Sequence, residues 1–450
     1  CGSSALLFSA RVSIHPAVQV VFCVPCASPP FPLRVTVTMA TVLEDFAAAM
    51  DGYWLIPGAA AVFFMQCGFL SLEVGSVRVK NTKNILLKNS VSPCIAIISW
   101  WMYGFALAFG GDEGGGNEFV GEDEFFLINS NRYIFFFFEW TFQAAAGTII
   151  SGPLAERIRF EAFCILNFVV SGVIYPFVAH WVWSPHGWLN DHFSVVDFAG
   201  SGVVHLLGGI AAICMTVILG ARDGRFDDQG KPVEIPGHSI ALVALGLLVL
   251  WFGWLSFNAC SSLTIAADGG AFTASKAVLN TTLSPMAALI VSMIFHKVYY
   301  REYIVPKMMN AALCATCAIT GPSGVVNAAS AVWIGVYCVV FYEITSDLLL
   351  YFKIDDAVDA FPVHAVGGAL GVINVGLFAE EELVAIYRGD HIKDNGTIEY
   401  TTNSYGLLMG GGWELLGGQL LELVTIVVWT AIISCIAAGG LRLAGLLRVD

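Results

Sequence analysis

Long apolar runs dominate the chain, each about the length that crosses a lipid bilayer, and short polar connections separate them. A membrane-spanning helix needs roughly 20 apolar residues, because it rises about 1.5 Å per residue through about 30 Å of hydrocarbon. The pattern predicts an all-α polytopic membrane bundle of about eleven transmembrane helices. The expected spans, with the eighth the shortest, lie near residues 53–74, 91–110, 132–152, 161–182, 200–220, 238–257, 274–296, 308–321, 328–350, 363–379 and 419–441.

The composition agrees with a membrane setting. The chain is 57% hydrophobic and 12% charged, whereas soluble domains carry about 25% charged residues. A chain this poor in charge cannot cover a surface that faces water everywhere, so the lipid bilayer is an expected partner. With 21 Lys and Arg against 35 Asp and Glu, the net charge is −14, and no nucleic acid partner is expected.

The charge of the connecting loops alternates along the chain. The loop after the first span is basic, and the next loop is acidic between Asp112 and Glu124. Cytoplasmic loops of membrane proteins carry an excess of Lys and Arg. This rule predicts an N-terminus outside and, with an odd number of spans, a C-terminus in the cytoplasm. The basic residues of the first loop are Arg78, Lys80, Lys83 and Lys88.

The first part of the sequence does not resemble the rest. The chain begins with Cys1, its first methionine is Met39, and the intervening stretch is rich in proline. Proline is unsuited to a helical span or to the apolar part of a signal peptide. We expect residues 1–38 to be a non-native upstream stretch or a leader, and residues 39–450 to form the membrane domain.

One short phrase occurs twice. VVHLLGG, containing His205 in the fifth span, is nearly repeated as PVHAVGG, containing His364 in the tenth. Because five is odd, two consecutive five-span halves have opposite orientations in the membrane. Inverted repeats of this kind are a common transporter architecture, with the site near the midplane. The sequence therefore predicts two inverted five-helix halves and a final helix.

A pair of histidines inside the membrane has three interpretations. Each ring can simply hydrogen-bond a neighbouring helix, the two can ligate a haem as in membrane cytochromes, or they can line a path for a small polar solute. An ionisable residue within the membrane is a functional candidate by default. The residues of the repeat alone leave these interpretations open.

Twelve cysteines are present, most of them within apolar runs. Buried cysteine usually behaves as a small hydrophobic residue. The Cys314-x-x-Cys317 pair has redox-motif spacing, but no βαβ pattern surrounds it. We therefore expect these two cysteines to pack between helices, and we expect no metal site and no cofactor.

The segment DFAGSGVVHLLGG, residues 197–209, closely resembles the signature of the ammonium transporter family, which includes the Amt, Mep and Rh proteins. The resemblance is closest to the eukaryotic and plant-like Amt branch. It implies a plasma-membrane homotrimer with one pore per subunit that transports ammonium, with methylammonium as a further substrate, and that is not an enzyme. Four more segments match in family order: LEVGSVRVKNTKNILLKN (72–89), LAERIRF (154–160), WFGWLSFNACSS (251–262) and DDAVDAFPVHAVGG (355–368).

The resemblance also assigns roles to residues. It implies an outer recruitment site for ammonium at Phe138, Trp183 and Ser261, where aromatic faces attract a cation and the hydroxyl accepts a hydrogen bond. Asp197 matches an acid of the family that either holds a helix start through backbone N–H groups or acts on the cation. Asp356 and Asp359 are expected to be structural acids at the cytoplasmic end.

Below the recruitment site the resemblance implies a narrow pore. Phe142 and Phe257 would form a hydrophobic constriction, and Trp254 would line the path beneath it. His205 and His364 would then face each other and share one proton. Ammonium would lose a proton at the outer site, and NH3, with or without that proton, would pass the histidines.

The chain departs from the family pattern in two places. Glu139 stands where the family usually carries an amide, so it is a possible modifier of the recruitment site. The family's cytoplasmic tail would follow residues 445–449, but the sequence stops at Asp450. Two other functions compete with transport. One is an ammonium sensor that conducts little, and the other, less favoured, is a bis-histidine haem protein.

Overall fold

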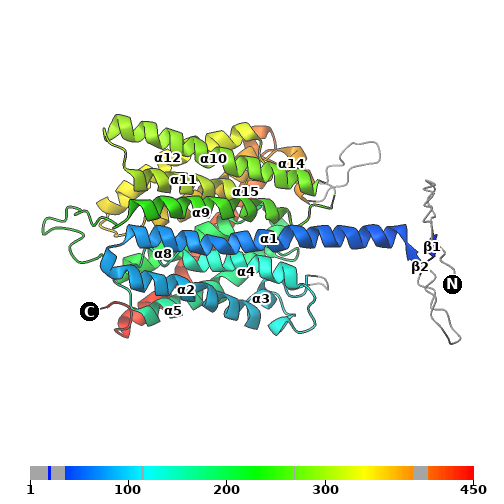
Figure 1. The fold of residues 1–450 in the computed structure, drawn as a ribbon, viewed down its shortest axis with the longest axis horizontal. Coiled ribbons are helices and arrows are strands. Elements are labelled where there is room, and N and C mark those ends of the chain that lie inside the picture. The colour runs from blue at the N-terminus through cyan, green and yellow to red at the C-terminus, as the bar shows by residue number, and fades with distance from the viewer. Residues whose placement is uncertain (1–18, 22–35, 113–115, 268, 389–403, 450) are drawn as a thin grey trace, which may run out of the picture.

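The computed structural model describes residues 19–21, 36–112, 116–267, 269–388 and 404–449. Two short strands, β1 (Gln19–Val21) and β2 (Thr36–Thr38), pair antiparallel, with Gln19 opposite Thr38. They lie beyond the start of the first helix, apart from the bundle (Figure 1). The rest of the described chain is helical with its connections, which confirms the predicted all-α membrane bundle. The interpretation of residues 1–38 stays a prediction.

The first half of the bundle begins with a long helix and ends with the helix that carries His205. Its α-helices are α1 (Met39–Ser76), α2 (Thr82–Ser99), α3 (Phe105–Phe109), α4 (Tyr133–Thr148), α5 (Phe160–Val169), α6 (Tyr175–Trp183), α7 (Trp188–Phe193) and α8 (Leu207–Leu219). Shorter helical turns connect or precede them: η1 (Val79–Asn81), η2 (Trp100–Gly104), η3 (Phe125–Leu127), η4 (Val170–Ile174) and η5 (Ser201–Leu206).

The second half and the last helix follow the same plan. The α-helices are α9 (Ile240–Ala259), α10 (Gly270–Tyr299), α11 (Val305–Thr320), α12 (Ala328–Tyr351), α13 (Gly367–Phe378), α14 (Glu381–Arg388) and α15 (Glu414–Leu443). The shorter turns are η6 (Cys260–Ser262), η7 (Phe361–Val366) and η8 (Leu407–Met409).

These helices account for the expected spans. Within the described residues, nine helices are long and apolar enough to cross a membrane, counting each with its adjoining turns. The other two expected spans are α4 and α11, of 16 residues each, and α11 is the short eighth span. α2 begins at Thr82, before the span expected near residue 91. α1 likewise begins at Met39, before the span expected near residue 53, and its first turns project beyond the rest of the bundle (Figure 1). Its first turns contain Glu44 and Asp45, which lower hydropathy without breaking a helix.

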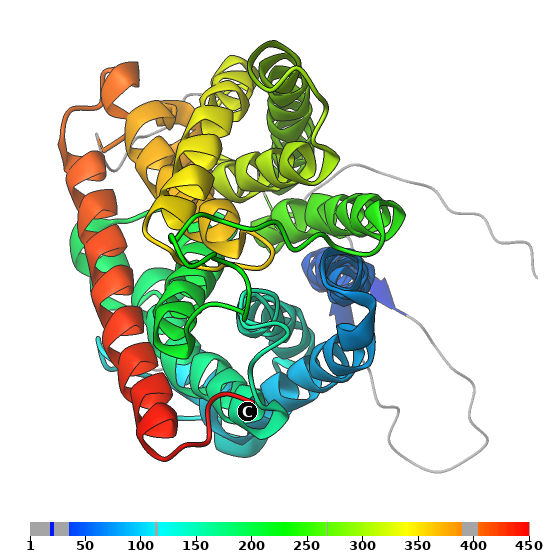
Figure 2. The same ribbon diagram turned by 90° about the vertical axis from the view of Figure 1, so that its left-hand side faces the viewer.

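The two halves pack against each other through their first helices. α1 and α9 run side by side across the bundle (Figure 1) and contact each other extensively. Seen along the bundle, α15 slants across one side (Figure 2). It contacts both α8 and α13, the helices that follow the two histidine turns. The last helix therefore covers the junction of the halves from outside, and the histidines lie inside.

Candidate functional site

The two histidines of the repeated phrase meet at the centre of the bundle. His205 lies in η5 and His364 in η7, and both turns are π-helical. Their Nδ1 atoms are 3.3 Å apart, and the ring planes are 23° from parallel with centroids 5.4 Å apart. Both rings are buried. At this distance one nitrogen can donate a proton to the other, as the resemblance implies.

The glycines of the repeated phrase explain how the two turns approach so closely. A Cβ added at Gly209 would lie 2.3 Å from the backbone nitrogen of Ala365, the residue after His364. A Cβ at Gly368 would lie 2.4 Å from the backbone nitrogen of Leu206, the residue after His205. The last glycine of each copy therefore packs against the other copy's histidine turn. Small residues permit such contacts between membrane helices.

Acids hold the start of both histidine turns. The Asp197 carboxylate accepts backbone hydrogen bonds from Gly200, Ser201, Gly202 and Val203 at 2.7 to 3.1 Å. The Asp356 carboxylate accepts them from Val358 at 3.3 Å and Phe361 at 2.8 Å. These donors are the unpaired N–H groups of a helix start. The structural role expected of Asp356 is confirmed, and Asp197 has the corresponding role in the first half.

An aromatic column lies on one side of the histidine pair. The ring of Trp254 is 4.9 Å from that of His205, and its Nε1 donates to Thr320 Oγ1 at 2.9 Å. The ring of Phe257 also stacks on that of His205, with ring centroids 5.8 Å apart. The ring centroids of Phe142 and Phe257 are 3.9 Å apart. All these side chains are buried. Phe142 and Phe257 together therefore close the path between His205 and the space beyond them.

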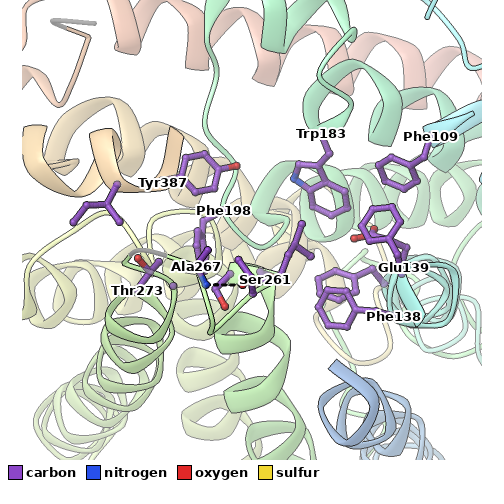
Figure 3. Close-up of a pocket in the computed structure, with 16 residues that line it drawn as sticks. Phe109, Phe138, Glu139, Trp183, Phe198, Ser261, Ala267, Thr273 and Tyr387 are labelled. Atoms are coloured by element: carbon purple, nitrogen blue, oxygen red, sulfur yellow. Dashed lines mark hydrogen bonds between the residues drawn. The ribbon is translucent and has the colours of Figure 1, made fainter. Parts of the chain in front are cut away.

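Beyond this constriction lies a cavity of about 360 Å³, which we call the large cavity (Figure 3). The space is far greater than the roughly 30 Å³ that one water occupies in the liquid, so it has room for a small cation together with water. The Ser261 hydroxyl at its edge donates to the Phe257 carbonyl at 2.9 Å, which leaves its oxygen lone pairs able to accept. Its lining includes Phe138, Glu139, Phe142, Trp183, Ser261 and Tyr387.

Glu139 brings a carboxyl group to the wall of the large cavity. It comes from α4 between Phe138 and Phe142, and only 6% of the residue is exposed. One of its oxygens, Oε2, is buried and has no hydrogen-bond partner among the described residues. In Figure 3 the side chain lies among the aromatic rings near Phe109 and Trp183. Because a buried carboxyl oxygen without a hydrogen bond is costly, this oxygen should bind a hydrogen-bond donor in the cavity, such as a cation or water.

A smaller cavity lies on the opposite side of the histidine pair. It measures about 30 Å³, enough for one small molecule, and we call it the small cavity. Its lining includes Phe69, Glu73, Asn310, Val358 and His364. His364 therefore faces a space of its own, while His205 faces the aromatic column. The order along the path is large cavity, constriction, His205, His364, small cavity.

An ion network fixes the loops at the small-cavity end. Asp355 accepts bonds from Arg222 Nε at 2.8 Å and Nη2 at 3.0 Å, and from Arg225 Nε at 3.2 Å. Burial alone would raise the pKa of Asp355, but the bonds and charge of Arg222 outweigh it and hold that pKa below its ordinary value. Glu156 has a lowered pKa for the same balance of reasons, with Arg78 as its main partner.

The structure gathers most of the residues assigned by resemblance. Phe138, Trp183 and Ser261 line the large cavity, as an outer site requires. Asp197 is 1% exposed and is not among the lining residues; it stands behind Trp183, whose Nε1 donates to the Asp197 carbonyl at 2.8 Å. Direct contact of Asp197 with a cation is therefore not part of this geometry.

Two further residues, one in the large cavity and one beside the histidine pair, were not expected from the sequence. Tyr387, in α14, lines the large cavity. Cys317, in α11, lies against the histidine pair, with Sγ 3.4 Å from His364 Nδ1. Tyr387 belongs to no motif, and the redox-motif spacing of Cys317 with Cys314 gives no reason to place it beside the histidines, so only the tertiary fold could reveal these positions. The haem interpretation fails on geometry, because axial ligands stand on opposite faces of a planar macrocycle, whereas these two rings touch.

Two cavities on either side of a narrow aromatic and histidine path, all within one polytopic chain, define a membrane transport protein. The sequence model of the Ammonium Transporter Family matches residues 53–450, and the chain belongs to that family. It is a transporter and not an enzyme.

Individual relatives agree with this assignment. The chain is 38% identical over 421 residues to "Ammonium transporter 1 member 3" of Solanum lycopersicum, covering 89% of each chain. It is 36% identical to "Ammonium transporter 3" of Dictyostelium discoideum, covering 89% of this chain and 90% of that protein. A solved structure titled "Sensor Amt Protein" superposes with a TM-score of 0.80 at 30% identity, covering 90% and 96% of the two chains. These plant and slime-mould relatives confirm the predicted Amt branch.

Proposed function

We propose that the chain takes up ammonium by binding NH4+ in the large cavity, where a water molecule accepts its proton, and passing NH3 through the constriction and along the histidine pair. The observation that carries this proposal is the order of groups along one path. A cavity with aromatic faces, a hydroxyl and a carboxyl group comes first, two stacked phenylalanines follow, and two facing imidazoles come last.

The large cavity suits a small cation with N–H donors. The rings of Phe138 and Trp183 present π faces, each worth about 0.5–2 kcal/mol to a nearby cation. Ser261 Oγ and the free oxygen of Glu139 accept hydrogen bonds from N–H groups. Asp197 does not contact the cation and acts indirectly, because it holds the η5 turn and the backbone beside Trp183. Methylammonium carries the same donors, and we expect it to be transported as well.

The constriction discriminates against ions. Moving a bare ion into a low-dielectric medium costs tens of kcal/mol by Born estimates, whereas a neutral polar molecule costs only a few. Phe142 and Phe257 offer no polar group to replace a hydration shell. Beyond them, His205 and His364 offer nitrogen donors and acceptors to neutral NH3. Because K+ and Na+ have no proton to lose, they cannot adopt a neutral form.

The distribution of charge suggests an orientation. Arg78, Arg222 and Arg225 lie at the small-cavity end. The other end carries acidic residues: Asp112, Glu118, Glu122, Asp123 and Glu124. By the positive-inside rule we propose that the small cavity opens toward the cytoplasm and the large cavity toward the outside, with the N-terminus outside. We propose the plasma membrane as the location and a homotrimer embedded in lipid as the assembly.

Growth of yeast that lacks its own ammonium transporters tests the proposal. Cells that express the chain should grow on low ammonium, and a His205→Ala, His364→Ala double variant present at the cell surface should fail to grow or lose selectivity for ammonium over K+. Unimpaired, selective growth of the double variant would refute the histidine path.

A sensor that binds ammonium but conducts little is the second candidate. The superposition on the structure titled "Sensor Amt Protein", with a TM-score of 0.80, supports it. Ammonium binding by the purified chain, without uptake into proteoliposomes, would establish that alternative.

A further inference from the structure

A third donor stands beside the two histidines at the midpoint of the path. Cys317 reaches the pair from α11, and its Sγ lies 3.4 Å from His364 Nδ1, which in turn lies 3.3 Å from His205 Nδ1. One ligand atom from each of the three residues lies within 4.8 Å of the other two. All three side chains are buried. Among the described residues, this is the one group of three or more such donors with that spacing.

The packing of glycine brings the thiol to this position. A Cβ at Gly367 would lie 2.9 Å from the Cβ of Cys317 and 2.6 Å from the carbonyl oxygen of Cys314. The helix that carries Cys317 is therefore held against the turn that carries His364. The donor atoms come from three separate elements, η5, η7 and α11, whose backbones are tightly packed. Such a set is held in place by the fold and does not depend on a flexible loop.

The spacing of the donors fits a metal ion. With metal–nitrogen bonds of about 2.05 Å, two nitrogens 3.3 Å apart subtend an angle of roughly 107° at the ion. With a metal–sulfur bond of about 2.3 Å, the 3.4 Å contact subtends roughly 103°. Both angles are close to tetrahedral. We propose that His205, His364 and Cys317 form a binding site for a soft d10 metal ion, copper(I), and that its occupation closes the ammonia path.

The chemistry of the donors selects the ion. Thiolate and imidazole together suit copper(I) and zinc, whereas carboxylate and carbonyl sites suit magnesium and calcium. Binding replaces the S–H bond of Cys317 with an S–Cu bond, and the thiol proton is released to water. Copper(I) thereby leaves a site with no net charge, while zinc(II) leaves one positive charge. Because uncompensated charge is costly in a buried site, copper(I) should bind more tightly there.

An ion at this site would block the path. It would occupy the ring nitrogens that ammonia meets between Trp254 and the small cavity, and it would tie the two histidine turns to α11. His364 lines the small cavity, so an ion can reach the site from that end without crossing the stacked phenylalanines. The closure rests on the proposed transport function, but binding of the ion does not.

The test uses the purified chain, with and without reconstitution into liposomes. Tetrakis(acetonitrile)copper(I) is added under argon, excess metal is removed, and copper per chain is measured by mass spectrometry. The same preparations take up radiolabelled methylammonium across a series of copper(I) concentrations, with a parallel series of zinc(II). The variants are Cys317→Ala, Cys317→Ser and, as a matched control, Cys314→Ala, which removes a buried thiol one turn away on the same helix.

We expect the unmodified chain and Cys314→Ala to retain one copper more than Cys317→Ala. Copper(I) should inhibit their uptake at concentrations at least about tenfold lower than in the Cys317 variants, since loss of even a second-shell partner costs about 10–100-fold in metal affinity. Both Cys317 variants should transport in the absence of metal, which shows that they fold. Equal copper retention and equal inhibition with and without Cys317, or inhibition through Cys317 by zinc but not by copper, would overturn the proposal. Failure of the unmodified chain to take up methylammonium before any metal is added would instead count against the transport function.

Discussion

Replacing Gly209 by alanine tests whether the close approach of the two histidine turns is what makes the path work. The added Cβ would lie 2.3 Å from the backbone nitrogen of Ala365, and real Cβ atoms essentially never come closer than 3.0 Å to another atom. The turns must therefore separate by at least about 0.7 Å, the difference between these distances. Backbone atoms cannot rotate away as a side chain can, so the separation falls on the histidines.

The size of the effect follows from this displacement. A shift of that size along the line between the rings would lengthen the Nδ1–Nδ1 contact from 3.3 Å to about 4.0 Å, beyond hydrogen-bond range. A hydrogen bond contributes about 0.5–1.5 kcal/mol net, which corresponds to a two- to tenfold fall in rate if the contact acts in the rate-limiting step. Overpacking should also cost about 1–3 kcal/mol of stability.

The measurement is the initial rate of radiolabelled methylammonium uptake in yeast that lacks its own ammonium transporters, divided by the amount of protein at the cell surface. Gly439→Ala is the control, because a Cβ at Gly439 in α15 meets nothing within 4 Å. We expect the control to match the unmodified chain and Gly209→Ala to fall two- to tenfold. Full uptake by Gly209→Ala at normal surface density would refute the reasoning.

Three further changes give separate predictions. Glu139→Gln should raise the methylammonium KM about fivefold with little change in maximal rate, because the amide keeps a hydrogen-bond acceptor but loses the attraction between opposite charges, which is about 1 kcal/mol at about 4 Å in water. Glu118→Gln, exposed outside the large cavity, is the control, and an unchanged KM in Glu139→Gln would contradict the role. Phe142→Ala should admit rubidium by opening the aromatic stack. Rubidium uptake no higher in that variant than in the unmodified chain would argue against the constriction. Asp355→Asn should lower the melting temperature in detergent at pH 7. Since the folded pKa of Asp355 is depressed, its stabilisation is present above the unfolded value of about 3.9 and is lost as the pH falls through the folded value, so the variant should melt with a weaker acid dependence; equal melting curves would refute this.

The spans and the histidine pair could be predicted because their signals are local. Apolar runs of membrane length mark the helices, and the repeated V-H-x-x-G-G phrase marks two equivalent positions in opposite halves. The alternation of five-span halves then brings His205 and His364 together without any knowledge of distances. The acids eight residues earlier hold equivalent turns for the same reason. Hydropathy did not show how far α1 and α2 extend before their spans, because polar residues in those first turns lower hydropathy without breaking a helix.

The large cavity could be predicted only through resemblance, since nothing in the pattern of Phe138, Trp183 or Ser261 distinguishes them from residues that pack a bundle. Tyr387 and Cys317 could not be predicted at all. Each reaches the path from an element that the sequence gives no reason to place there, and Cys317 in particular has the spacing of a redox motif. Its neighbour in space, His364, is 47 residues away along the chain.

The two cavities differ about twelvefold in volume, 360 Å³ against 30 Å³, and this inequality bears on how flux depends on concentration. It cannot set the net direction of movement, because at equilibrium the forward and backward fluxes are equal whatever the shape of the path. It does set the shape of the two dose–response curves. Entry from the large cavity, where a cation gathers among aromatic rings, should saturate at low concentration, while exit through the small cavity should stay proportional to concentration over a wider range. A cell that scavenges scarce nitrogen would then reach its maximal uptake rate at a low ammonium concentration.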